Sequence, residues 1–504
     1  MAQFLVSDSS AEKILRLIRT KKDAFWSRER ERRPLQLFHE VARRVPAYKD
    51  FLRKNKINPA KIRTFKDFQL VPPVSKKTYL REYPLKQLVW DGTLKKHLVY
   101  TSTSGSTGEP FYFPRGEQLD WEYSILAELF LEHSSYGARG PTLVVVGLGM
   151  GVWIGGLISY KAFEIASRRG KHEISIITPG INKKEIFHAL RNLAPHYKET
   201  ILIGYPPFVK DVVDEAGGQG INLKKLNMRI LTAAEAYTEN FRDYLAKKAG
   251  IKNLYRDMSN IYGTADIGAM AWETPTAILM RRLAMHRQEF FERLFSPIRK
   301  TPTLTQYNPF FVTFEAPGGD IFLSGNNTIP LVRYAIGDHG GAFSFREATT
   351  SLESFDISLV KEARAIGIEN YLYELPFVYV YERKDFSTTL YGLQVYPETV
   401  REILIEKPFL KFFTGKMTMM TKFDTKQNQY LELNFEFRKK KKPTLVLKKK
   451  LLQCIVKNLE EKNSEFRELH RHIGVRALPK LIFWPKDHEL HFTPGVKQKW
   501  VKKQ

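Results

Sequence analysis

The stretch PTLVVVGLGMGVWIGGLISY, residues 141–160, decides which class of fold this chain can adopt. Its twenty residues carry no charge, and a helix of that length can cross a bilayer. Five of the residues are glycines, and three of these alternate at 147, 149 and 151. Because glycine weakens helices and allows sharp turns, the pattern favours a buried strand at 143–146, a glycine loop and the start of a helix. We therefore expect a strand–loop–helix unit and no membrane span.

Strand-like and helical segments alternate after this stretch. Including the first, β-rich runs are expected at 143–146, 173–178, 200–204 and 228–234. Helices are expected between and after them at 183–193, 208–216 and 239–249. This alternation predicts an α/β fold with a largely parallel sheet. Residues 9 to about 60 have a helical pattern, with a capping box expected at Ser9 and Glu12, and the chain after about 385 has the pattern of a smaller α+β unit.

Composition limits the class of protein. The chain has 504 residues, of which 43% are hydrophobic, so a large core and about two to four domains are expected. A single cysteine, Cys454, excludes an internal disulfide framework and a cysteine-rich zinc site, and fits a cytoplasmic location. The first residues lack the charged and apolar regions of a signal peptide.

The net charge of +26 raises the question of nucleic-acid binding. The excess is spread along the chain, with one dense patch formed by RKKKK at 438–442 and KKK at 448–450. The first run follows the alternating strand pattern of 430–437, and the second opens a helical stretch at 448–463. No RNA- or DNA-binding motif accompanies them. The sequence therefore favours a solvated basic surface and no nucleic-acid partner.

A second stretch, TSTSGSTGEP at 101–110, combines six hydroxyl side chains with two glycines. Glycine lets a backbone approach a ligand closely, and hydroxyls and free amides donate hydrogen bonds to phosphate. No Gly-Lys-Ser/Thr closes the loop, so it is not a Walker A motif. Taken alone, such a run is more often a surface loop than a phosphate-binding loop. The candidate phosphate-binding residues are Thr103, Ser104, Gly105, Ser106, Thr107 and Gly108.

Three segments further along the chain occur in a characteristic order. They are IYGTADIG at 261–268, IPLVRYAIGDHG at 329–340 and YERKDFSTTLYGLQVYPETV at 381–400. Together with the hydroxyl-rich loop, this ordered set resembles the adenylate-forming superfamily, and within it the phenylacetate–CoA ligase-like branch. The lead-in VPAYKDFLRKNKI at 45–57, followed by LVPPVSKKTYLRE at 70–82, resembles the same branch. The likeness extends from about residue 35 to the end.

The resemblance implies an architecture and a nucleotide site. It implies a large adenylation domain at 1–382, with mixed and parallel sheets between helices, and a small mobile α+β domain at 383–504. In such proteins a carboxylate at the position of Asp338 accepts hydrogen bonds from both ribose hydroxyls. The other residues that the resemblance assigns to the nucleotide, beside the hydroxyl-rich loop, are Glu235, Tyr262, Gly263 and Arg383.

The resemblance also assigns the chemistry to particular side chains. A lysine near the C-terminus bridges the substrate carboxylate and the α-phosphate, and here Lys497 or Lys499 fills that role, since Val496 separates Gly495 from the first of them. Asp266 stands where the superfamily has a glutamate that binds Mg²⁺, and Ala265 replaces a hydroxyl residue. Asp385 matches the hinge. The expected acyl pocket residues are Trp153, Gly155, Gly156 and Tyr205.

The expected function is ATP-dependent activation of a small carboxylic acid to an acyl-adenylate, followed by transfer of the acyl group to coenzyme A. Three alternatives stay open: an adenylating enzyme with an amine, carrier protein or cofactor as acceptor, a degenerate nucleotide-binding protein, and a nucleic-acid-associated protein.

The spacing of two motifs departs from the pattern of the superfamily. Asp338 and Arg383 are 45 residues apart, an unusually long interval, and the extra segment at 345–376 contains a predicted helix at 358–365.

Overall fold

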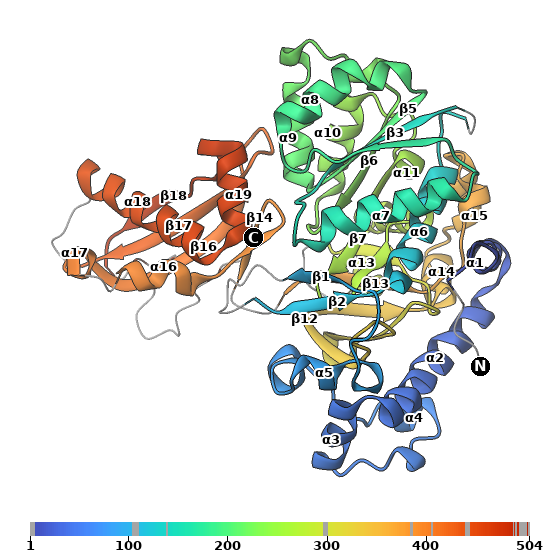
Figure 1. Cartoon of the computed structure of the whole chain (residues 1–504). Helices are drawn as coiled ribbons and strands as arrows, with labels where there is room; N and C mark the ends of the chain where they lie inside the picture. Colours follow the sequence, from blue (N-terminus) through green and yellow to red (C-terminus); the bar gives the residue numbers. More distant parts are fainter. Residues whose placement is uncertain are drawn as a thin grey trace.

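The computed structural model describes residues 6–102, 110–137, 140–295, 301–383, 387–404, 407–438, 444–486, 488, 491–492 and 501. A large part and a smaller C-terminal part lie side by side (Figure 1). An 11-stranded mixed sheet runs through the large part in the order β10-β11-β12-β13-β9-β8-β7-β6-β5-β3-β4. The α/β class predicted from the sequence is confirmed.

The parallel half of the sheet contains the predicted strands. It consists of β3 (Thr142–Gly147), β4 (Ile174–Ile177), β5 (Glu199–Gly204), β6 (Met228–Ala233) and β7 (Met258–Thr264). The antiparallel half consists of β8 (Gly268–Trp272), β9 (Thr303–Gln306), β10 (Val312–Glu315), β11 (Asp320–Gly325), β12 (Leu331–Phe343) and β13 (Phe377–Arg383). The sheet is thus less parallel than the first four strands alone predict.

Helices cover both faces of the parallel strands because alternate side chains point to opposite sides. Val144 and Val146 pack in one core with α6 (Glu117–Glu132) and α7 (Ile154–Arg168), whereas Leu143 and Val145 pack in another core, on the opposite face. The second core contains α8 (Lys183–Asn192), α9 (Pro206–Glu215) and α10 (Glu239–Ala249). The stretch at 141–160 is therefore β3, a glycine loop and the start of α7, as predicted.

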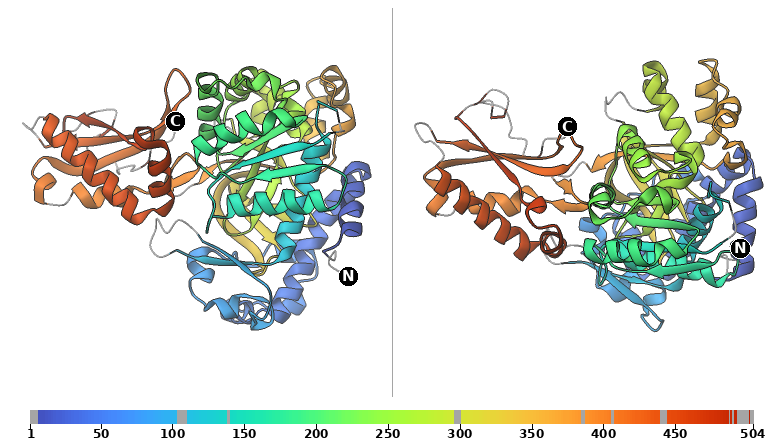
Figure 2. Two further views of the ribbon diagram at one scale, coloured as in Figure 1. Left: turned by 45° about the horizontal axis from the view of Figure 1, so that its top comes forward. Right: turned by 90° about the horizontal axis from the view of Figure 1, so that it is seen from above.

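The N-terminal helices lie beside the antiparallel half of the sheet, except for the first, which packs against α6 (Figure 2). They are α1 (Asp8–Thr20), α2 (Asp23–Arg44), α3 (Pro46–Lys54), α4 (Phe65–Phe68) and α5 (Leu85–Leu88). The predicted capping box at Ser9 and Glu12 is wrong. Ser7 caps the helix instead, accepting from the Ser10 amide at 3.2 Å, and Glu12 pairs with Lys171.

The extra segment between β12 and β13 contains two helices, of which the sequence predicted only the second. They are α14 (Phe345–Glu353) and α15 (Leu359–Ala365), and they pack into one core with α12 (Pro275–His286) and α13 (Gln288–Leu294). A capping box formed by Ser344 and Glu347 starts α14. The segment is therefore an integral part of the large lobe.

The smaller C-terminal part begins where the large sheet ends. It contains β14 (Thr388–Leu390), β15 (Leu393–Val395), β16 (Phe413–Phe423), β17 (Gln429–Phe437) and β18 (Lys480–Trp484). Its helices are α16 (Pro397–Leu404), α17 (Lys407–Leu410), α18 (Leu445–Lys462) and α19 (Ser464–Ile473). The predicted domain boundary between 382 and 383 stays a prediction, and Arg383 is still the last residue of β13 in the large sheet.

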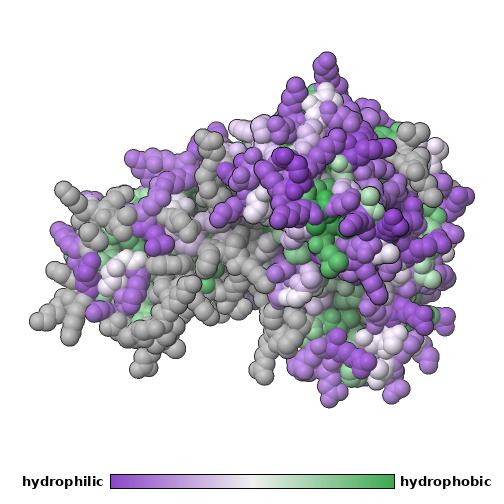
Figure 3. Space-filling view, turned by 90° about the horizontal axis from the view of Figure 1, so that it is seen from below, coloured by the Kyte–Doolittle hydropathy of each residue, from purple (hydrophilic) through white to green (hydrophobic). Residues whose placement is uncertain are grey.

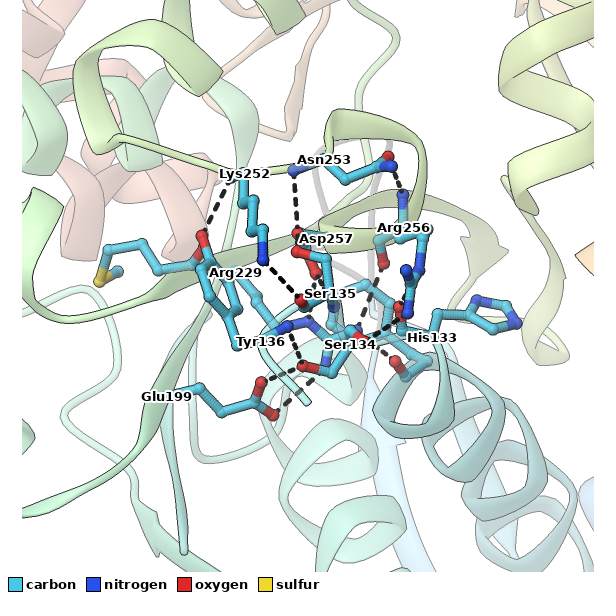
Figure 4. Close-up of polar contacts among 12 residues, drawn as sticks. His133, Ser134, Ser135, Tyr136, Glu199, Arg229, Lys252, Asn253, Arg256 and Asp257 are labelled. Atoms are coloured by element: carbon cyan, nitrogen blue, oxygen red, sulfur yellow. Dashed lines mark hydrogen bonds and ion pairs between the residues drawn. The ribbon is translucent and has the colours of Figure 1, made fainter. Parts of the chain in front are cut away.

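A buried polar network closes the amino-terminal ends of the parallel strands (Figure 4). Arg229 of β6 is fully buried, and its guanidinium lies 3.2 Å from Asp257 and 3.4 Å from Glu199. Asp257, which ends α11 (Leu254–Asp257), accepts hydrogen bonds from the amide and hydroxyl of Ser135. The segment after α6 is thereby tied to the sheet at the edge opposite the cavity described below.

Hydrophilic residues cover most of the face seen in Figure 3, and hydrophobic residues gather in a patch on the large part. Within the described ranges, no helix combines the length and the apolar character that crossing a membrane requires.

Candidate functional site

A cavity of about 740 Å³ opens at the carboxyl ends of the parallel strands, where it borders the C-terminal part. Tyr205 follows β5, Ala234 follows β6 and Thr264 ends β7, and all three line it. Ligands of open α/β sheets bind in the crevice at this edge, because the loops that follow the strands surround it. Side chains of the C-terminal part complete the wall, among them Gly392, Gln429 and Glu465.

Most of the predicted site residues that the structure describes line this one cavity. They come from five separate segments of the chain and are Trp153, Gly155, Tyr205, Glu235, Tyr262, Gly263, Asp266 and Asp338. Gly156 is not among the lining residues. It is buried against Gly149, and a Cβ atom added there would come within 2.4 Å of the Gly149 carbonyl oxygen.

The structure describes the remaining predicted site residues only in part or not at all. Thr103, Ser104, Gly105, Ser106, Thr107, Gly108, Asp385, Lys497 and Lys499 lie outside the described residues. The strands β1 (Val99–Ser102) and β2 (Tyr112–Arg115) pair on either side of the hydroxyl-rich loop, and Ser102 at the end of β1 lines the cavity. Arg383 is the last residue of β13, directly opposite Asp338 of β12.

Asp338 is held in a fixed orientation at the cavity wall. It is 6% exposed, and one of its carboxylate oxygens accepts a hydrogen bond of 2.5 Å from the hydroxyl of Tyr262. Tyr262 in turn packs on the ring of Phe314, with centroids 6.1 Å apart. A buried carboxylate with a fixed donor on one side can still accept from a ligand, since an ionised carboxylate has about four acceptor positions.

Asp266 is also buried, and it has two polar neighbours from distant parts of the chain. The Tyr334 hydroxyl donates to its Oδ2 atom at 2.5 Å, and the Lys76 ammonium lies 3.4 Å from its Oδ1 atom. Lys76 comes from the lead-in segment, which is attached to β12 through a bridge between Val74 and Tyr334. Lys76 also lines the cavity, so it adds a positive charge where the sequence predicted only a metal ligand.

Asp266 fits the role of a Mg²⁺ ligand. Mg²⁺ is commonly held by one or two carboxylates together with phosphate oxygens and water. Among the described residues no hydrogen bond reaches Oδ1 of Asp266, and the buried hydroxyl of Thr264 nearby in the chain has no partner either. Within the same residues there is no cluster of three or more His, Cys, Asp or Glu side chains suited to a metal.

Glu235 joins the large part to the C-terminal part. One carboxylate oxygen accepts from the Gly392 amide, and the other accepts from the Gln429 side chain at 2.7 Å. Gly392 and Tyr391 form the two-residue turn between β14 and β15, and both have positive φ angles, as a type I′ turn requires. The turn packs against Tyr205, since a Cβ added at Gly392 would lie 2.4 Å from the Tyr205 ring.

A second set of contacts holds the same turn. The Tyr391 hydroxyl donates to Asp211 at 3.2 Å, and Arg476 donates to the other oxygen of Asp211 at 2.7 Å. The amide of Tyr391 donates to the side-chain oxygen of Gln429 at 2.6 Å. We call Glu235, Gln429 and the turn 391–392 the latch. The Glu235 carboxylate predicted beside the nucleotide is thus also the point where the two parts meet.

Ala234, between β6 and Glu235, has a φ of +75°. Residues with a Cβ atom seldom adopt this left-handed conformation, which costs roughly 1–2 kcal/mol relative to glycine. The strain lies at the cavity wall, where the backbone approaches the ligand space.

The part of the cavity beneath α6 and α7 is mainly apolar. Its walls include Leu148, Ile154 and Ile158, together with Trp153 and Tyr205. Burial raises the pKa of the Tyr205 hydroxyl above its ordinary value, so this group is neutral at physiological pH. Tyr123 and Ser159 supply two hydroxyls to the same wall. This region suits the apolar body of an acid and differs from the polar region around Asp338 and Asp266.

Sequence reasoning missed several residues of the cavity. Asn260 lies just before the Tyr262 motif, donates to the Glu235 carbonyl at 2.9 Å, and has a buried side-chain oxygen without a partner. Lys76 belongs to the lead-in at 70–82 that resembles the phenylacetate–CoA ligase-like branch, so its Pro-Pro-Val-Ser-Lys pattern was the available signal. No signal pointed to Tyr123, Ser159 or Glu465.

Glu465 is the one carboxylate that the C-terminal part contributes to the described cavity wall. It lies in the first turn of α19, and burial raises its pKa to about 7. Within the described part of the chain, no hydrogen bond or ion pair satisfies it. Its charge therefore changes near physiological pH, and a basic group of a ligand could bind to it.

The fold is that of the adenylate-forming enzymes. The structure of a 2-hydroxyisobutyryl-CoA ligase in complex with 2-HIB-AMP and CoA, in the thioesterification state, matches with a TM-score of 0.59 and 15% sequence identity, over 97% of this chain and 91% of that one. A structure of the same ligase in the postadenylation state, in complex with R3-HIB-AMP, matches with a TM-score of 0.50 and 13% identity, over 100% and 91% of the two chains.

Among curated proteins, the chain is similar to the phenylacetate–coenzyme A ligase of Thermus thermophilus. The two are 23% identical over 242 residues, which are 47% of this chain and 49% of the relative. The chain thus matches about half the length of that relative. No family model matches it. The resemblance to the adenylate-forming superfamily and its phenylacetate–CoA ligase branch, predicted from the sequence, is confirmed by these two kinds of similarity.

Proposed function

We propose that the protein is an AMP-forming acid–thiol ligase that activates a small carboxylic acid with ATP and transfers the acyl group to coenzyme A. The observation that carries the proposal is the single cavity of about 740 Å³, which unites the polar motifs with an apolar compartment. The likeness to phenylacetate–coenzyme A ligase supports the same reaction class. In the first step a carboxylate oxygen of the acid attacks the α-phosphorus of ATP, and pyrophosphate leaves.

The nucleotide is proposed to bind along the wall formed by β7 and β12. Asp338, oriented by Tyr262, accepts from the ribose hydroxyls, and the unpartnered oxygen of Asn260 is an acceptor suited to the adenine amino group. The hydroxyl-rich loop and Arg383 are proposed to contact the phosphates. The ammonium of Lys76, near Asp266, adds attraction for the phosphate charge.

When bound, Mg²⁺ neutralises phosphate charge and so makes the α-phosphorus easier to attack. Asp266 is the proposed ligand through Oδ1, while Tyr334 holds its other oxygen. Lys497 or Lys499 is proposed to stabilise the negative charge that builds up between the acid and the α-phosphate. In the second step the thiolate of coenzyme A attacks the acyl carbon, the bond to AMP breaks, and the thiol proton passes to solvent.

The proposal is tested by carboxylate-dependent exchange between ATP and pyrophosphate, run in the adenylating direction over a panel of aryl and fatty acids. Coenzyme A is then added, and AMP release and thioester formation are measured. Lys497→Ala combined with Lys499→Ala is expected to abolish exchange. Lys502→Ala combined with Lys503→Ala removes the same charge from the same tail and is the matched control. Exchange that survives the first pair contradicts the lysine assignment.

One observation favours a second candidate acceptor, an amine. Glu465 contributes a carboxylate without a partner among the described residues to the side of the cavity formed by the C-terminal part, and such a group can bind an ammonium and take its proton. Amide formation in place of thioester formation, when amines and coenzyme A compete, would favour this candidate. Tight ATP binding without exchange for any acid would instead indicate a degenerate nucleotide-binding protein.

A further inference from the structure

Two buried hydroxyls face one another in the apolar part of the cavity wall without a good hydrogen bond. The Tyr123 hydroxyl of α6 lies 3.5 Å from the Ser159 hydroxyl of α7, and the two residues are 3% and 1% exposed. Hydroxyl–hydroxyl hydrogen bonds are normally about 2.5–3.0 Å long, so this contact is weak. Among the described residues neither hydroxyl has another hydrogen bond, and an unsatisfied buried hydroxyl is destabilising.

The surroundings of the pair are apolar and uncharged. The two helices contribute Tyr123, Ile154, Gly155, Ile158 and Ser159 to the cavity wall, and none of these carries a charge. Burial raises the pKa of Tyr123 to about 12, so its hydroxyl keeps its proton at neutral pH and can donate. The indole N–H of Trp153, another wall residue, is likewise buried without a partner.

We propose that the acid this protein activates is an aromatic carboxylic acid that carries a hydroxyl group on its apolar body, and that Tyr123 and Ser159 bind this hydroxyl. The proposal rests on the proposed function and names its substrate class. Two oxygens 3.5 Å apart can both lie about 2.8 Å from a third oxygen. A ligand hydroxyl at that point accepts from one side chain and donates to the other.

The same geometry argues against other substituents. A hydrogen atom or a methyl group on the ring would leave both buried hydroxyls without a strong partner. A charged amino or carboxylate group would be buried without an opposite charge from these two helices, which is more costly still. Two aromatic residues, Trp153 and Tyr205, line the same wall, and aromatic side chains pack well with an aromatic ring. A neutral hydroxyl on a ring therefore matches the wall best.

The test measures kcat/KM for pyrophosphate exchange with four probes: phenylacetate, 4-methylphenylacetate, 3-hydroxyphenylacetate and 4-hydroxyphenylacetate. One of the two hydroxylated acids is expected to exceed phenylacetate by about 10- to 100-fold, because phenylacetate leaves a buried donor or acceptor of the wall unpaired. Ser159→Ala and Tyr123→Phe are each expected to reduce this ratio by about 10-fold. The matched variant Tyr160→Phe removes a hydroxyl from the same helix, α7, at an exposed position outside the cavity lining, and leaves the ratio as it is.

The outcomes separate the two hypotheses. Exchange with these acids but no preference for either hydroxylated probe overturns the inference and leaves the proposed function standing. A preference that survives both Ser159→Ala and Tyr123→Phe also overturns it, because the hydroxyl is then recognised elsewhere. Absence of exchange with every acid, in a protein that is folded by circular dichroism, overturns the proposed function and the inference with it.

Discussion

Replacing Gln429 with glutamate places two carboxylates face to face in the latch. In the structure the Gln429 side chain donates to Glu235 at 2.7 Å and accepts from the Tyr391 amide at 2.6 Å. Gln429→Glu keeps the acceptor for Tyr391 but removes the donor to Glu235. We expect the hairpin of β14 and β15 to separate from Glu235 much more often than in the unmodified protein.

The size of the effect follows from the lost hydrogen bond. A hydrogen bond to a charged group contributes about 1.5–3 kcal/mol, because the carboxylate is otherwise desolvated without compensation. This range corresponds to about a 10- to 150-fold increase in the open population of the latch. In the variant, repulsion between the carboxylates at positions 235 and 429, which are both largely buried positions, further increases the open population.

Hydrogen–deuterium exchange, followed by mass spectrometry of peptides from 387–404, measures this opening. The amides of Tyr391 and Gly392 both donate to latch side chains, so their exchange rate reports the open population. In Gln429→Glu the amides of this segment are expected to exchange about 10- to 150-fold faster. Peptides from β3 and β5, which lie in the core of the large part, should be unaffected.

A double variant that exchanges the side chains of residues 235 and 429 provides the control. Glu235→Gln combined with Gln429→Glu restores every donor and acceptor of the latch, because the new glutamine at 235 donates to the new carboxylate and accepts from the Gly392 amide. The double variant is expected to return the exchange rate to within a few-fold of the unmodified protein. A single variant that exchanges no faster, or a double variant no slower than the single one, would refute the proposed role of the latch.

Three further predictions concern other groups. Asp338→Asn weakens one side of the proposed ribose contact, and the Kd for ATP, measured by isothermal titration calorimetry, is expected to rise about 10- to 100-fold; an unaltered Kd contradicts the assignment. Asp266→Asn removes a charged Mg²⁺ ligand, so the Mg²⁺ concentration for half-maximal exchange should increase about 10-fold or more, and an unchanged requirement argues for another ligand. Burial raises the pKa of Glu122 from 4.5 to about 8, so the folded state holds a proton that the unfolded state has lost. The free energy of unfolding should therefore fall between pH 4.5 and 8, by up to about 1.4 kcal/mol per pH unit, and Glu122→Gln should remove this slope in urea titrations at several pH values. A variant with the same slope as the unmodified protein shows that other groups are responsible.

Local patterns were enough to predict most of the parallel half of the sheet. The run at 143–146 and the glycines after it predict a strand and a loop because the residues responsible are neighbours in sequence. The same holds for the helix at 239–249, whose observed bounds equal the predicted ones. The antiparallel half of the sheet was harder to predict from the sequence, because strand pairing there depends on segments far apart in the chain.

The N-cap of α1 illustrates a smaller limit of prediction from the sequence. Ser7, Ser9 and Ser10 are all possible caps by residue type, and the sequence alone favours Ser9 because Glu12 follows it at capping-box spacing. In the structure Glu12 pairs with Lys171, 159 residues away, and the cap moves to Ser7. The spacing that favoured Ser9 thus depended on Glu12, whose partner in the structure is distant in the sequence.

Local propensity and motif likeness were enough to predict the fold class, the order of the motifs and some of the residues that line the cavity. They could not predict which distant side chains meet there. Lys76 lies beside Asp266, Gln429 binds Glu235 across 194 residues, and the Tyr123 hydroxyl faces that of Ser159. The reason is physical: hydrogen bonds and ion pairs act over a few ångströms, so their partners are set by how the packed elements are arranged and not by their separation along the chain.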